Sequence, residues 1–90
     1  MRHERIIRRD DGTRIRITVW LFLDYCGSRW TYRVESSAKG KRLWHRPILE
    51  CEINRLSPLD QKRRYLELAS EQEILDTMRE LIAQIEPKLE

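Results

Sequence analysis

The alternation of apolar and polar side chains is clearest between Thr13 and Tyr25. From Ile15 onward every odd position of this stretch is apolar, whereas the even positions are mainly arginine, threonine and aromatic residues. Successive side chains of a strand point to opposite faces, so the pattern predicts a strand with one buried face and one arginine-rich, aromatic face. The rest of the chain is expected to pair with this strand or to cover its buried face.

A first hairpin is predicted at Asp10-Asp11-Gly12, which follows a predicted strand over residues 4–9. Asp-Gly between apolar stretches favours a hairpin, because glycine tolerates the positive φ that such turns need. Two registers are open. A two-residue loop pairs Ile6 with Ile17, and a three-residue loop with a glycine bulge pairs Ile7 with Ile15.

A second hairpin is predicted at Gly27-Ser28, as a two-residue type II′ turn with glycine first. A loop one residue longer would exchange the faces of every side chain in the third strand, so burial favours the two-residue loop. The chosen register makes the apolar face continuous through the pairs Tyr25–Trp30, Leu23–Tyr32 and Leu21–Val34. On the opposite face it sets Phe22 across from Arg33 and Trp20 across from Glu35, close enough for ring–guanidinium contact.

A third turn over residues 38–40 predicts a short fourth strand over residues 42–46. A three-residue loop here would set Trp44 opposite Val34, on the buried face of the sheet. The next residue, a proline, ends this strand or keeps it at an edge of the sheet. Alternation continues weakly over residues 48–53, which form either a strand or an extended linker.

Two helices are predicted in the remainder of the chain. A Ser-Pro pair, with Asp three residues after the Ser, opens a helix over about residues 58–68. A second capping box, Ser70 to Glu73, opens another helix that Pro87 ends; the alternative is one fused helix. Apolar residues recur in the second helix at helical spacing, namely Ile74, Met78, Leu81, Ile82 and Ile85.

These elements predict an α+β fold with an antiparallel β-meander of about four strands and two C-terminal helices packed on one face. Residues 1–90 form one domain, with a basic sheet over residues 1–55 and a helical segment over residues 56–90. The stripe of the second helix is expected to cross the apolar sheet face.

Charge divides the chain unevenly. Residues 1–46 hold twelve Lys/Arg and five Asp/Glu, a net +7, whereas residues 47–90 hold six and ten, a net −4. The total is +3. This asymmetry favours an anionic partner for the first half. The acidic face of the second helix is either ordinary solvated surface or a surface that docks on a basic groove of a nucleic-acid enzyme.

The cellular setting is expected to be the cytoplasm. The start of the sequence has no pattern of a secretory leader, and the longest uncharged apolar run, residues 19–23, is far below the roughly 20 residues that cross a bilayer. The only cysteines are Cys26 and Cys51, whereas a small secreted domain usually holds several disulfides. Two cysteines therefore fit a reducing cytoplasm better, and a single Cys26–Cys51 bridge is the less favoured alternative.

Motifs for catalysis are absent from the sequence: there is no glycine-rich phosphate loop, nucleophile elbow or His-Glu-x-x-His. The two histidines, His3 and His45, lie too far from each other and from the cysteines to give the spacing of a metal site. The adjacent Asp10 and Asp11 are explained by the turn they occupy. We expect no enzyme activity, no cofactor and no metal.

The arginine and aromatic face of the sheet is the strongest functional signal. Domains with exposed aromatic residues among arginines use such faces to stack bases and hold phosphates, and the basic third turn would add phosphate contacts. The alternative is that the N-terminal strand, residues 48–53 or a homodimer mate covers the aromatic rings. The candidate binding residues are Arg14, Arg16, Trp20, Phe22, Arg29, Arg33, Lys39, Lys41 and Arg42.

Three segments resemble small uncharacterised proteins of phages and prophages: the opening His3 to Thr13 (HERIIRRDDGT), the turn and strand Gly40-Lys41-Arg42-Leu43-Trp44, and the helical end. That class includes anti-CRISPR proteins, compact inhibitors that bind Cas nucleases or their guide complexes. The resemblance implies a non-enzymatic phage accessory protein that binds and inhibits a bacterial nucleic-acid-handling defence complex. Many such inhibitors imitate DNA with negative charge, and the net +3 argues against that mimicry. The other hypothesis is a domain that binds DNA or RNA directly through the same face.

Overall fold

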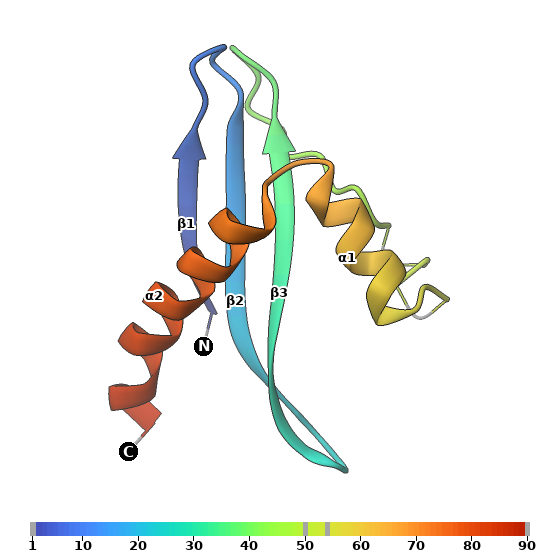
Figure 1. Ribbon diagram of the computed structural model, residues 1–90, viewed down its shortest axis with the longest axis vertical. Helices are drawn as coiled ribbons and strands as arrows, with labels where there is room; N and C mark the ends of the chain where they lie inside the picture. Colours follow the sequence, from blue (N-terminus) through green and yellow to red (C-terminus); the bar gives the residue numbers. More distant parts are fainter. Residues whose placement is uncertain (1, 50, 54, 90) are drawn as a thin grey trace.

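The computed structural model describes residues 2–49, 51–53 and 55–89, and confirms the α+β class (Figure 1). The antiparallel sheet has three strands in the order β1-β2-β3, where four were predicted. The two helices follow the sheet in the chain. The elements are β1 (Arg2–Arg8), β2 (Arg14–Asp24), β3 (Gly27–Ser37), α1 (Pro58–Leu66) and α2 (Glu71–Leu89).

The β1–β2 hairpin takes the three-residue loop with the glycine bulge. Ile7 pairs with Ile15, and the backbone N–H of Arg9 donates to Thr13 at 2.8 Å. Gly12 has a φ of 89°, a value that costs glycine little and other residues much. Asp11 accepts a hydrogen bond from the backbone N–H of Thr13, and this bond lowers the pKa of its carboxyl group.

The β2–β3 hairpin corrects the predicted register. The loop consists of Tyr25 and Cys26, and Gly27, with a φ of 115°, is the first residue of β3 instead of the first residue of the loop. The pairing therefore slides by four residues. An even slide leaves every side chain on its predicted face. The new pairs are Leu21–Trp30, Val19–Tyr32 and Ile17–Val34 on the buried face, and Phe22–Arg29, Trp20–Thr31 and Thr18–Arg33 on the other.

The predicted fourth strand is not formed. After β3 the chain turns at Ala38–Lys41 and makes one isolated bridge, in which Ser36 and His45 exchange backbone hydrogen bonds. Trp44 was predicted opposite Val34, and the observed bridge differs from that register by an odd number of residues. Trp44 consequently lies on the face opposite to the predicted one. The described part of residues 48–53 consists of bends, turns and irregular chain, and holds no strand.

Both helices begin at their predicted caps. The hydroxyl of Ser57 accepts from the backbone N–H of Asp60, and Ser70 and Glu73 form a reciprocal capping box with both bonds at 3.1 Å. The break between the helices is therefore real. Pro87 does not end α2, which continues to Leu89. A proline in the last turn removes a single backbone donor, and the carbonyl left without it is that of Ala83, an exposed residue.

The core lies between α2, α1 and the predicted apolar face of the sheet, where Ile17, Val19 and Val34 have no exposed surface. Figure 1 shows α2 crossing the sheet in front of β1 and β2, while α1 lies beside β3. The end of the β2–β3 hairpin, residues 21–30, extends beyond the start of β1, and its tip projects away from both helices (Figure 1). Leu23 is 74% exposed there and Tyr25 is fully exposed. The prediction that these two residues belong to the buried face is therefore wrong. No helix of the described chain is long and apolar enough to cross a bilayer.

Candidate functional site: the arginine-rich outer face

The outer face of the sheet is the face turned away from the buried apolar residues. The registers of both hairpins place the even-numbered side chains of β1 and β2 on this face, together with the odd-numbered side chains of β3. Its described charged side chains are the arginines Arg2, Arg8, Arg14, Arg16, Arg29 and Arg33 and the glutamates Glu4 and Glu35. Among these described side chains, positive charge therefore exceeds negative charge three to one.

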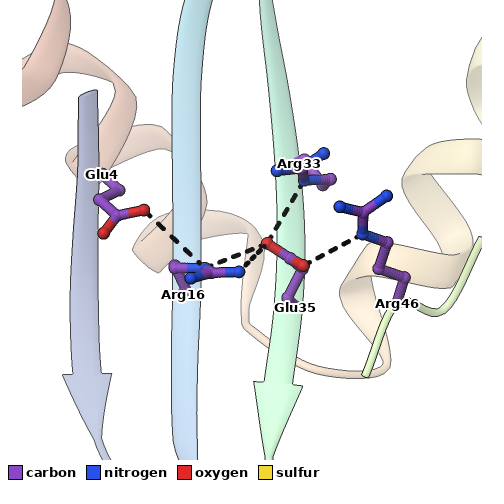
Figure 2. A network of polar contacts seen from close by, with 5 residues as sticks. All are labelled: Glu4, Arg16, Arg33, Glu35 and Arg46. Carbon is purple, nitrogen blue, oxygen red and sulfur yellow. Dashed lines mark hydrogen bonds and ion pairs between the residues drawn. The ribbon is translucent and has the colours of Figure 1, made fainter. Parts of the chain in front are cut away.

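Glu35 organises the centre of the outer face. Its side chain is only 1% exposed, and its Oε1 accepts from Nε and Nη2 of Arg16 at 3.1 and 2.9 Å. Arg33 approaches the same oxygen at 3.3 Å, and Arg46 donates to Oε2 at 3.2 Å. Figure 2 shows the arginines reaching the carboxylate from different sides, with Glu4 of β1 beyond Arg16. One buried anion thus fixes the positions of three cations.

The aromatic rings of this face are in contact with guanidinium groups, as the sequence predicted, although with different partners. The guanidinium carbon of Arg29 lies 5.3 Å from the ring centre of Phe22, and those of Arg2 and Arg33 lie 4.7 and 5.9 Å from Trp20. Such contacts add a modest attraction and hold both groups in place. Phe22 remains 42% exposed, whereas Trp20 is half-buried.

The segment after β3 covers part of the outer face. Residues 48–53 were a predicted alternative cover, whereas Trp44 and Arg46 were not expected on this face. The ring of Trp44 lies 4.4 Å from the guanidinium carbon of Arg16 and 5.1 Å from that of Arg14. Arg46 and the buried Ile48 follow along β3. The centre of the outer face is therefore a partly covered network of arginines and aromatic rings. The face is open at the projecting hairpin end.

The basic third turn is exposed and lies next to the outer face. Arg14 donates to the backbone carbonyl of Lys41 at 2.7 Å and to the hydroxyl of Ser37 at 3.1 Å, which fixes the turn against the sheet. Lys39 packs its stem against Gly12 of the first hairpin: a Cβ at Gly12 would lie 2.7 Å from Lys39 Cγ. The exposed Lys39, Lys41 and Arg42 thus extend the basic surface to one end of the molecule.

Two ion pairs join the inner side of β1 to the acidic face of α2. Arg9 donates two hydrogen bonds to the carboxylate of Glu73, at 2.6 and 2.9 Å, and Arg5 pairs with Glu80. The bonds from Arg9 hold the pKa of Glu73 at about 2. Part of the charge asymmetry between the two halves is therefore neutralised within the chain. This contact accounts for acidic residues that sequence reasoning assigned to solvent or to a partner.

Acid should weaken the ion pair between Arg9 and Glu73. A pKa lowered from 4.5 to about 2 contributes stability that is present above pH 4.5 and lost as the pH falls through about 2. The pair is about one-third exposed, so we expect a contribution of about 1–2 kcal/mol. Unfolding free energies measured in urea from about pH 5 down to about pH 2 should fall more steeply for the wild type than for Glu73→Gln. Parallel slopes would contradict this assignment.

The described residues contain no group of three His, Cys, Asp or Glu side chains placed to hold a metal ion. Cys26, at the projecting hairpin end, and Cys51 are both exposed and do not form a disulfide with each other. Comparison with known proteins adds no assignment: no protein-family model, no curated protein and no solved structure matches the chain significantly.

Of the predicted binding residues, the structure brings six to the outer face and three to the adjoining turn. The outer-face residues are Arg14, Arg16, Trp20, Phe22, Arg29 and Arg33, and the turn residues are Lys39, Lys41 and Arg42. The sequence prediction missed Arg2, Trp44 and Arg46. Arg2 follows from the three-residue loop of the first hairpin, which sets it opposite Trp20. The positions of Trp44 and Arg46 on the outer face follow only from the odd shift of the bridge after β3.

Proposed function

We propose that this chain is a non-enzymatic phage-type accessory protein that binds a bacterial nucleic-acid-handling complex, such as a Cas effector, and blocks it. The observation that carries the proposal is the outer face, where arginines held around the buried Glu35 present fixed positive charge. Arginine forks held in place by other contacts suit phosphate oxygens, because little side-chain freedom is lost on binding. The anionic contact would be guide RNA or DNA within the complex.

The projecting hairpin end supports a protein component in the partner. Leu23, Tyr25 and Phe22 expose apolar surface at one tip, where the helices do not cover the sheet. Grouped exposed apolar residues on a small protein commonly mark a contact with another macromolecule. A ribonucleoprotein offers apolar protein surface for the tip and phosphates for the outer face.

A second candidate is direct binding of free DNA or RNA through the same surface. The exposed turn with Lys39, Lys41 and Arg42 favours it, because these cations adjoin the outer face and would lengthen a contact with the phosphate backbone. Contacts of this kind position a nucleic acid without reading its sequence.

Gel shifts across a salt series, with random duplex and single-stranded oligonucleotides, separate the two candidates. Counterion release predicts micromolar binding at about 50 mM salt that weakens steeply as salt is raised. Oligonucleotide binding that persists at about 150 mM salt would favour direct binding of nucleic acid. For the inhibitor, we expect loss of oligonucleotide binding at that salt, while the chain captures a nucleic-acid-handling complex from a bacterial lysate, with a nuclease-treated lysate as control. If the chain neither binds oligonucleotides at low salt nor captures such a complex, both candidates are contradicted.

A further inference from the structure

A pocket of about 210 Å³ lies where the outer face meets α1 and the segment after β3. Its walls include the rings of Trp20 and Tyr65 and the side chain of Ile48. Arg2, Arg33 and Arg46 also line it, and its described lining includes no Asp or Glu. The pocket thus combines apolar, partly aromatic walls with guanidinium groups.

The walls are held by the fold. Ile48 and Tyr65 are buried, and burial raises the pKa of the Tyr65 hydroxyl. Arg33 lines the pocket and its Nε lies 3.3 Å from Glu35, while the guanidinium carbon of Arg2 lies 4.7 Å from the ring centre of Trp20. Contacts within the protein thus position the side chains around the pocket.

Size and charge together define the ligand. Pockets for drug-sized molecules occupy roughly 300–1,000 Å³, so this one suits a smaller group, such as one flat heterocycle. Arg2 and Arg33 both contact Trp20, and guanidinium groups favour an anion such as phosphate. A nucleotide, in which a sugar joins an aromatic base to a phosphate, matches this combination of walls and charge.

We propose that this pocket binds one unpaired nucleotide, with the base between Trp20, Tyr65 and Ile48 and the phosphate beside Arg2 and Arg33. A base in a duplex is stacked and paired, and so does not enter such a pocket without being extruded. The inference rests on the proposed contact of the outer face with nucleic acid and adds where an unpaired base lies. The nucleotide comes either from a single strand or from the free nucleotide pool.

The indole N–H signal of Trp20 in a ¹H–¹⁵N NMR spectrum, assigned with Trp20→Phe, is the direct readout. We expect it to shift in a saturable way with a single-stranded RNA oligonucleotide, and not with inorganic phosphate or a blunt duplex. A shift with AMP as large and as tight as that with the oligonucleotide would identify the free nucleotide as the source. A much weaker effect of AMP would identify the single strand.

Two arginines of the same strand provide a matched pair of variants. Arg2 and Arg8 are both exposed on the outer face at opposite ends of β1, but only Arg2 lines the pocket. Arg2→Ala should weaken the binding reported by Trp20 by about tenfold, the effect of one charge-assisted contact, and Arg8→Ala by less than about twofold. Equal effects of the two variants would overturn the pocket assignment.

The outcomes also distinguish this inference from the proposed function. Salt-dependent binding of oligonucleotides that leaves the Trp20 signal unmoved would overturn the pocket and leave the outer-face contact standing. A saturable Trp20 shift with AMP, with no binding of any nucleic acid or ribonucleoprotein, would support the pocket and contradict the proposed function.

Discussion

Replacing Glu35 by Gln is expected to lower the free energy of unfolding by about 2–4 kcal/mol, because it removes the one buried anion among three arginines. The variant keeps the shape of the side chain and leaves the guanidinium groups of Arg16, Arg33 and Arg46 facing one another. Because the arginines are partly exposed, the expected loss is somewhat smaller than the roughly 3–5 kcal/mol typical of a broken, fully buried ion pair.

Glu4→Gln is the control for this prediction. Glu4 also carries a carboxylate toward Arg16, at 3.9 Å, but its side chain is 54% exposed. Exposed pairs contribute less than about 1 kcal/mol, so this variant should unfold close to the wild type. Urea denaturation with an unchanged slope measures both. Similar losses of unfolding free energy in the two variants would contradict the central role of Glu35 in holding the arginines.

Ile17→Ala should cost about 2–5 kcal/mol, since its side chain has no exposed surface and the change leaves a cavity between the sheet and the helices. Leu23 lies on the same face of the same strand and is 74% exposed. Leu23→Ala should therefore change stability by less than about 0.5 kcal/mol. Thermal unfolding of the two variants tests whether helix packing stops before the hairpin end. A comparable loss from Leu23→Ala would contradict the projecting hairpin.

The sequence predicts the faces of the sheet better than it predicts the pairing of residues. In the β2–β3 hairpin the turn moved from Gly27-Ser28 to Tyr25-Cys26, and the pairing slid by four residues. Each side chain nevertheless stayed on its predicted face, because side chains alternate with a period of two and the slide was even. After β3 the shift was odd, so Trp44 moved to the other face. Turn position depends on one or two backbone angles, which alternation does not report.

Helix starts were predictable because the capping bonds are local: Ser57 with Asp60 and Ser70 with Glu73 are each three residues apart. The pairing of Arg9 with Glu73 joins residues 64 positions apart, and charge in a sequence does not name its partner. The same limit applied to the candidate site. The arginines of the outer face were predicted, but the pocket needs Ile48 and Tyr65, which reach it through the turn after β3 and through α1.

The claim that the outer face binds an anionic polymer is tested most directly by two double charge reversals of equal size. Arg29→Glu with Arg42→Glu changes the outer face and its adjoining turn, whereas Arg63→Glu with Arg64→Glu makes the same change in net charge on the exposed side of α1. Fluorescence anisotropy with a labelled single-stranded RNA at about 50 mM salt measures the affinity of each. The account predicts a loss of about tenfold or more for the first pair and less than about threefold for the second. Equal losses would show that net charge alone governs binding and would contradict the outer face as the site.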